Sequence, residues 1–116
     1  MSRDMKRLPL ERDMEAAIRE AVEYQGGRVW AIRDSRKMAV TDMPDLIVVL
    51  PPLVALLELK SQRRHVTDGQ RVVLDLLSGC TEVTSGIVRP IARAGEMSYD
   101  DALRMLGVID QMEKTA

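Results

Sequence analysis

The chain has 116 residues, which is enough for one domain and leaves hardly any room for a second. Apolar residues make up 46% and charged residues 30%, an ordinary globular composition, and no apolar run is long enough to cross a bilayer. The formal net charge of -1 gives the whole molecule no electrostatic reason to bind nucleic acid, and the single Cys80 excludes an intramolecular disulfide. The first residues lack the apolar core of a signal peptide, so we expect a cytoplasmic protein.

The first quarter of the chain predicts a helix followed by a strand. Apolar residues at helical spacing predict a helix over residues 10–24, and Gly26-Gly27 suits its end. Residues 28–33 alternate between apolar and polar, which predicts a strand. The charged and turn-forming residues 34–43 then predict a loop.

The middle of the chain predicts an antiparallel hairpin of two buried strands. Residues 45–50 and 53–60 are apolar enough for burial, and Pro51-Pro52 between them predicts the turn. The polar residues 61–66 that follow predict a loop.

The second half of the chain predicts two helices with short strands between them. A helix is predicted over about residues 67–77, and four apolar residues in it are expected to face the core: Val72, Val73, Leu76 and Leu77. Residues 81–83 and 86–92 predict short strands, and Pro90 places the second of these at a sheet edge or a bulge. The last helix is predicted over about residues 98–112, with one apolar side formed by Ala102, Leu103, Leu106 and Ile109.

The order of these elements is α-β-β-β-α-β-(β)-α, which is typical of an α/β fold. It predicts one compact domain over residues 1–116, with a core over about residues 10–93 around a mixed sheet and a C-terminal helix. The small size without accessory domains also favours a protein encoded by a phage or another mobile element.

Three polar residues of the hairpin are predicted to meet at one end of the sheet. Glu58 and Lys60 are two residues apart in a strand, so their side chains point to the same face. Asp45 opens the preceding strand and lies opposite residues 58–60 if the hairpin forms. A charged pair at the end of a buried strand is costly unless it is paired or holds an ion.

This set has a chemical interpretation as a metal site. Two carboxylates can bind a hard cation such as Mg²⁺, whose other ligands are water and a phosphate oxygen. The carbonyl of Leu59 is a candidate further ligand, and Glu11 or Glu15 of the first helix can supply a third carboxylate. The alternative is a same-face ion pair of Glu58 with Lys60 and a turn role for Asp45.

The ordered set of motifs resembles the PD-(D/E)xK nucleases, and within them the VRR-NUC branch. The resemblance is carried by "PDL" at 44–46, "ELK" at 58–60, an acidic first helix ending at Gly26-Gly27, and Gln70 at the next helix. It covers roughly residues 11–84 and implies an α-β-β-β-α-β core of the restriction-endonuclease type.

The resemblance also implies a role for each site residue. Asp45 and Glu58 would bind Mg²⁺ or Mn²⁺, with Glu15 or Glu11 completing the acidic cluster. Lys60 would assist the attacking water, and Gln70 would help to place that water or the scissile phosphate. The reaction would be the hydrolysis of phosphodiester bonds in DNA, on flaps or four-way (Holliday) junctions, by a homodimer.

Other predictions concern DNA contacts and rival functions. Four basic residues are candidate phosphate contacts, with an ordinary exposed loop as the alternative: Arg36, Lys37, Arg63 and Arg64. Gln70 can equally be a solvent-facing helix residue. The rival functions are a catalytically silent module that binds branched DNA, and a small assembly protein without DNA affinity.

Overall fold

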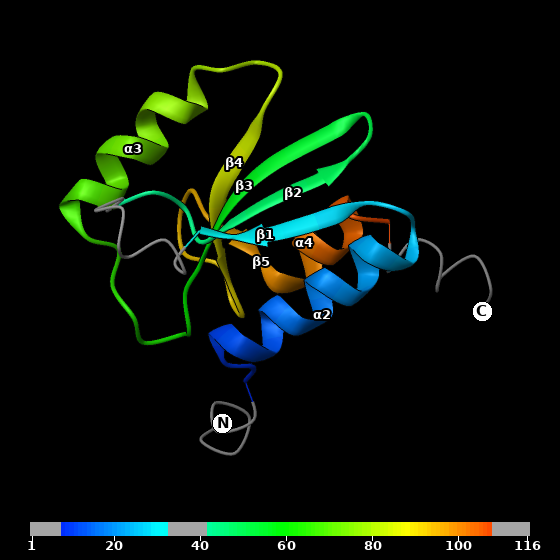
Figure 1. Cartoon of the computed structure of the whole chain (residues 1–116). Coiled ribbons are helices and arrows are strands. Elements are labelled where there is room, and N and C mark those ends of the chain that lie inside the picture. Colours follow the sequence, from blue (N-terminus) through cyan, green and yellow to red (C-terminus); the bar gives the residue numbers. More distant parts are fainter. Residues whose placement is uncertain (1–7, 33–41, 108–116) are drawn as a thin grey trace.

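The computed structural model describes residues 8–32 and 42–107 of the chain, and they form an α/β fold around a mixed sheet (Figure 1). The helices are α2 (Glu11–Tyr24), α3 (Asp68–Ser78) and α4 (Tyr99–Met105). The strands are β1 (Arg28–Ala31), β2 (Leu46–Leu50), β3 (Leu53–Leu59), β4 (Thr84–Arg89) and β5 (Met97–Ser98). Among the described residues, no helix is both long and apolar enough to cross a membrane.

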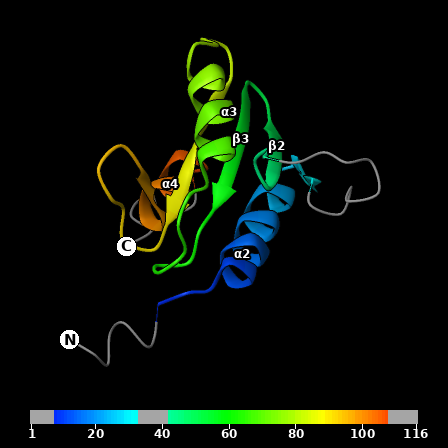
Figure 2. The ribbon, with the colours of Figure 1, turned by 90° about the vertical axis from the view of Figure 1, so that its left-hand side faces the viewer.

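The described strands form one sheet in the order β1-β2-β3-β4-β5. The pairs β1/β2 and β2/β3 are antiparallel, whereas β3/β4 and β4/β5 are parallel. Helices α2 and α4 lie against one face of this sheet, and α3 lies on the other (Figures 1 and 2). The predicted α/β class with a mixed sheet is therefore confirmed.

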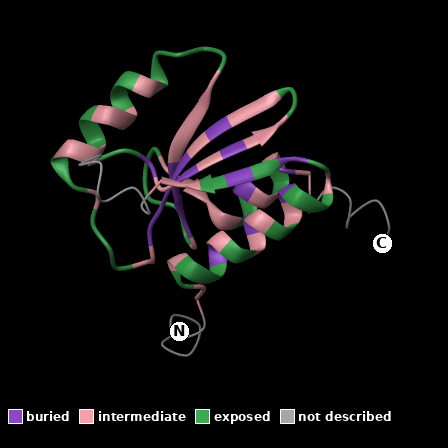
Figure 3. Ribbon diagram, in the orientation of Figure 1, coloured by how far each residue is buried: buried purple, intermediate pink, exposed green. Residues whose placement is uncertain are grey.

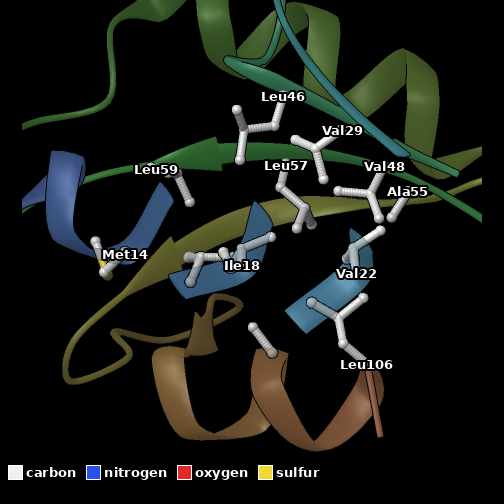
Figure 4. Close-up of a cluster of buried hydrophobic side chains, with 12 residues drawn as sticks. Met14, Ile18, Val22, Val29, Leu46, Val48, Ala55, Leu57, Leu59 and Leu106 are labelled. Atoms are coloured by element: carbon white, nitrogen blue, oxygen red, sulfur yellow. The ribbon is translucent and has the colours of Figure 1, made fainter. Parts of the chain in front are cut away.

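The core lies between the sheet and helix α2, with α4 closing one side (Figure 4). Met14, Ile18 and Val22 recur every fourth residue along α2, which puts all three on one stripe, and none is exposed. They pack against alternate residues of the strands, including Leu57 and Leu59 of β3. Because alternate strand residues face α2, the intervening residues of β3 must face the side of α3.

Helix α2 ends where the sequence predicted, at Gly26-Gly27. Gly26 has φ = +90°, a backbone conformation that side chains with a Cβ rarely adopt. A Cβ at Gly27 would lie 2.5 Å from the carbonyl oxygen of Val49, so only glycine lets the chain pass this close to β2.

The predicted hairpin is confirmed. Strands β2 and β3 pair antiparallel from Leu46 opposite Leu57 to Leu50 opposite Leu53, across the Pro51-Pro52 turn. One further step along this register places Asp45 opposite Glu58. The backbone pairing alone therefore sets Asp45 and Glu58 opposite each other.

The prediction that α3 buries four apolar residues is wrong. No residue of α3 is buried, as Figure 3 shows. Val72 and Leu76 are 60% and 72% exposed. The helix rests beside β4 on a half-buried stripe of Val73, Leu74 and Leu77, which leaves Val72 and Leu76 on its flank. Val73 and Leu77 are on the predicted side, but the sequence could not show how little of the sheet α3 covers.

The predicted strands after α3 also need correction. Residues 81–83 form a turn, and a single strand, β4, begins at Thr84. This strand lies inside the sheet rather than at its edge, because the two-residue strand β5 adds beyond it. Pro90 follows the last residue of β4, where its missing N–H interrupts no strand pairing. The part of the last predicted helix beyond residue 107 lies outside the described residues.

Candidate active site

Asp45 and Glu58 are brought together at the end of the β2–β3 hairpin. The Oδ2 atom of Asp45 accepts a hydrogen bond of 3.1 Å from the backbone N–H of Leu59. The carbonyl of Asp45 accepts another, of 2.7 Å, from the N–H of Ile32 at the end of β1. Asp45 is thereby held by both neighbouring strands, with its carboxyl directed toward β3.

Glu58 and Lys60 are buried side by side, as their strand spacing predicted. They are 2% and 3% exposed, and Lys60 Nζ lies 3.7 Å from Glu58 Oε2. Gln70 donates from Nε2 to the same Oε2 atom at 3.3 Å. The other oxygen, Oε1, is buried and has no hydrogen-bond partner among the described residues. Within the described residues, Glu58 therefore has one oxygen with a hydrogen-bond partner, Oε2, and one without, Oε1.

Burial of two nearby carboxyls raises the pKa of both. Desolvation is the largest cause for Glu58, followed by the charge of Asp45, and together they raise its pKa from 4.5 to about 8. Desolvation also raises the pKa of Asp45, while the Leu59 N–H and the Lys60 ammonium oppose the rise. The nearby ammonium of Lys60 is therefore not enough to hold the pKa of Glu58 at its ordinary value.

Gln70 has a structural role and a site role at once. It is the third residue of α3, and its Oε1 accepts from the N–H of Thr67 while its own N–H donates to the Thr67 hydroxyl. This reciprocal capping box starts the helix. The remaining amide group, Nε2, is then directed at Glu58. Gln70 is thus not the solvent-facing residue of the alternative interpretation.

The two acids of α2 that are candidates for the site, Glu11 and Glu15, have different surroundings. The charge of Glu11 raises the pKa of both Asp45 and Glu58, so Glu11 lies within electrostatic reach of the site. Glu15 instead pairs with Arg19 at 3.4 Å. These pKa effects favour Glu11 as the acid that acts on the carboxyl pair, and a ligand role for Glu15 stays a prediction.

The predicted phosphate contacts are only partly described. Arg63 and Arg64 are exposed in the loop after β3, and Arg64 lies 3.7 Å from the carboxylate of Glu11. The loop therefore begins next to the site residue Lys60, and its two arginine side chains are exposed to solvent. The other two predicted contacts, Arg36 and Lys37, lie outside the described residues.

Sequence reasoning missed Arg89, which holds the loop after β3. Its side chain is fully buried and forms two hydrogen bonds, of 2.7 and 2.9 Å, to the carboxylate of Glu96. Its remaining nitrogen donates to the carbonyls of Ser61 and Arg64. The available signal was an arginine directly after two buried apolar residues, Ile87 and Val88, at the end of β4.

The donors present fit a hard, hydrated cation. In residues 8–32 and 42–107, no group of three or more His, Cys, Asp or Glu side chains is arranged to hold a metal ion. Mg²⁺, however, needs only one or two carboxylates, because water and substrate phosphate fill its other positions. Asp45 and Glu58 supply such a pair, and the unsatisfied Oε1 of Glu58 is an oxygen that a cation would satisfy. The carbonyl of Leu59 stays a predicted further ligand.

In metal-free protein we expect stability to fall as pH rises toward 8. The raised pKa of Glu58 means that the folded state keeps a proton that the unfolded chain releases above about pH 4.5. The stability contributed by neutral Glu58 is complete below that pH and is lost progressively up to about pH 8. Urea unfolding in EDTA buffers measures this dependence. Glu58→Gln should flatten it, and an equally steep fall in the variant would contradict the assignment.

Three chemical functions meet at this end of the sheet. Two carboxyls can bind a cation, a buried ammonium can stabilise negative charge, and an amide fixes one carboxylate oxygen. Such a combination suits the attack of water on an anionic substrate. Comparison of the chain with protein-family models, curated proteins and solved structures gives no significant match, so the function is inferred from the residues themselves.

Proposed function

We propose that the chain is a divalent-metal-dependent DNA endonuclease of the VRR-NUC type. The observation that carries the proposal is the buried pair of Asp45 and Glu58, with Lys60 at 3.7 Å from Glu58 and one Glu58 oxygen lacking a hydrogen-bond partner among the described residues. The element order and strand pairing from α2 to β4 support a core of the restriction-endonuclease type, which is part of the proposal.

A purely structural ion pair accounts poorly for these residues. A stable buried pair satisfies both partners, because uncompensated charge in the interior is costly. Here the pKa of Glu58 is raised to about 8 despite the adjacent ammonium, and Asp45 adds to that rise. A cation between the two carboxyls would remove this repulsion, which favours a metal-binding role over a packing role.

The proposed mechanism assigns one task to each group. The cation, when bound by Asp45 and Glu58, would lower the pKa of a water molecule and neutralise charge on the phosphate. Lys60 stabilises the negative charge that builds up on the phosphate oxygens. The N–H of Leu59 and the amide of Gln70 hold the two carboxylates in place. Glu11 adds negative charge that favours cation binding.

The silent DNA-binding module is disfavoured by the same charges. A module that only binds DNA gains nothing from two carboxyls facing a phosphate, because either one repels the phosphate when it is ionised and no metal is bound. The assembly-protein alternative likewise leaves the pairing of Asp45 with Glu58 unexplained.

The DNA shape and the oligomeric state belong to the proposal too. Flaps and four-way junctions are the proposed substrates, and a homodimer would present two sites to a symmetric junction. The flank of α3 supports the dimer, since Val72 and Leu76 form an exposed apolar pair one helical turn apart. Packing of α3 against its copy would cover both residues.

A cleavage assay tests the proposed function directly. The protein is incubated with Mg²⁺, Mn²⁺ or EDTA and with single-stranded, duplex, flap and four-way-junction DNA. We expect cleavage of branched DNA with either metal and none with EDTA, because the carboxyl pair cannot act on phosphate without a cation. Absence of cleavage of all four DNAs with either metal would overturn the proposal. Cleavage in EDTA would overturn the metal role.

Thr67 provides a matched control for the role of Gln70. Each residue contributes one half of the capping box, so Thr67→Ala and Gln70→Ala should each lower the free energy of unfolding by about 1 kcal/mol. Only Gln70→Ala also removes the hydrogen bond to Glu58, and we expect it alone to lower the cleavage rate, by about tenfold. Unfolding and cleavage are measured on both variants. Equal rates would show that Gln70 acts only as a cap.

A further inference from the structure

The only tryptophan of the chain, Trp30, lies exposed on strand β1. Its side chain is 50% exposed, so it does not belong to the core. A single exposed apolar residue is common on protein surfaces and needs no explanation by itself. Its position relative to the candidate active site is what distinguishes Trp30.

The strand register places Trp30 on the same face of the sheet as the carboxyl pair. Trp30 pairs with Ile47 and Ile47 pairs with Leu56, so these three side chains form one row across the sheet. Asp45 lies two residues before Ile47, and Glu58 lies two residues after Leu56, so these two positions form the next row on the same face. Side chains two residues apart share a face, and the two rows are about 6.7 Å apart along the strands.

In residues 8–32 and 42–107, the two residues that separate Trp30 from the carboxyl pair along the sheet are apolar. Ile47 and Leu56 are half-buried, and helix α3 lies over β4 rather than over β1. The indole therefore stands at the outer end of an apolar strip whose next row holds the carboxyls. A nucleotide adjacent to a phosphate at Asp45 and Glu58 would come within reach of this strip.

Strand β1 also contains a positively charged residue close to Trp30. Arg28, two residues before Trp30, is exposed and projects to the same face, while Val29 between them is buried on the core side. An aromatic ring beside an arginine is the combination with which proteins hold single-stranded nucleic acid, the ring for a base and the cation for the backbone. This pairing favours a nucleic acid over an apolar protein surface as the occupant.

We propose that Trp30 stacks on an unpaired nucleobase next to the scissile phosphate, with Arg28 toward the adjoining backbone. The inference rests on the proposed endonuclease function, because it takes the carboxyl pair as the place of that phosphate. Every base offers a π-face, so the contact does not read sequence. A base inside a duplex has both faces covered by its neighbours, so Trp30 selects DNA with an unpaired nucleotide near the cut.

Because the chain has one tryptophan, its fluorescence reports on this contact alone. Wild-type protein is titrated at low salt, with Ca²⁺ in place of Mg²⁺, with a single-stranded oligonucleotide and with a blunt duplex of the same length. We expect the single strand to quench the tryptophan emission. The dissociation constant from this quenching should equal the one measured by fluorescence anisotropy of a labelled oligonucleotide. The blunt duplex should change the emission little.

Two substitutions separate stacking from general apolar contact. Trp30→Phe keeps an aromatic face, whereas Trp30→Leu keeps only apolar bulk. We expect Trp30→Leu to weaken single-strand binding about tenfold and Trp30→Phe to remain within about twofold of wild type. Because Trp30 is exposed, both variants should unfold at the wild-type urea midpoint, which checks that the fold is intact.

Several results would overturn the stacking proposal. These are single-strand binding without a change in emission, no single-strand binding at low salt, and equal affinities for Trp30→Leu and Trp30→Phe. An emission shift that follows protein concentration alone, together with dimerisation in sedimentation, would show that a second copy covers Trp30. Wild-type cleavage is scored separately. Cleavage without a tryptophan response rejects only the stacking, and a response without cleavage rejects only the endonuclease.

Discussion

Asp45→Asn is expected to lower the metal-dependent cleavage rate about 10³-fold while leaving the fold intact. Asparagine keeps an oxygen that can accept the N–H of Leu59, so the link between β2 and β3 survives. It removes the negative charge that a hard cation needs from its ligands.

Lys60→Met is expected to lower the cleavage rate about 10² to 10³-fold, because the charge that stabilises the phosphate is lost.

The control for Asp45→Asn is Glu82→Gln, which neutralises an exposed acid in the turn before β4. That turn lies at the opposite end of β3 from Glu58, because Thr84 pairs with Ala55 and Ile87 with Glu58. Initial rates with Mg²⁺ on a branched substrate compare the three variants, and thermal unfolding checks their folds. Cleavage by Asp45→Asn or Lys60→Met at the wild-type rate would remove those residues from the mechanism.

The site was predictable where it depends on backbone periodicity. The spacing of Glu58 and Lys60 fixes their common face, and the Pro51-Pro52 turn fixes the register that sets Asp45 opposite them. These relations follow from local rules that need no tertiary information. The hydrogen bond from Gln70 to Glu58 was not predictable in this way, because it depends on how α3 packs against the sheet, and the sequence left a solvent-facing Gln70 equally open.

The remaining features depend on how separate elements pack. The different environments of Glu11 and Glu15 depend on which residues α2 meets in the fold, which a helical repeat does not encode. The exposure of Val72 depends on how much of the sheet α3 covers. Arg89 lies 31 positions after Glu58, and only the parallel pairing of β3 with β4 brings the two strands together. No local pattern identifies such contacts.

Arg89→Met is expected to cost about 3–5 kcal/mol of unfolding free energy, a large part of the stability of a small domain. The substitution leaves the carboxylate of Glu96, 7% exposed, without its buried counter-charge. It also leaves the carbonyls of Ser61 and Arg64 without their shared donor. Since this loop follows directly on Lys60, cleavage should fall as well. Urea unfolding at pH 7 measures the stability effect.

A double variant and a neighbouring arginine sharpen the test of Arg89. Arg89→Met combined with Glu96→Leu removes both charges and should be more stable than Arg89→Met alone, because no uncompensated charge stays buried. Arg93→Met removes an exposed arginine that also donates to the loop, to the carbonyl of Gln62 at 2.8 Å, and should cost under about 1 kcal/mol. The hydrogen bond from Arg89 lowers the pKa of Glu96 below 4.5, so the pair's contribution is present above that pH and is lost in stronger acid. Equal costs for Arg89→Met and Arg93→Met would show that burial of the Arg89–Glu96 pair is not what holds this loop.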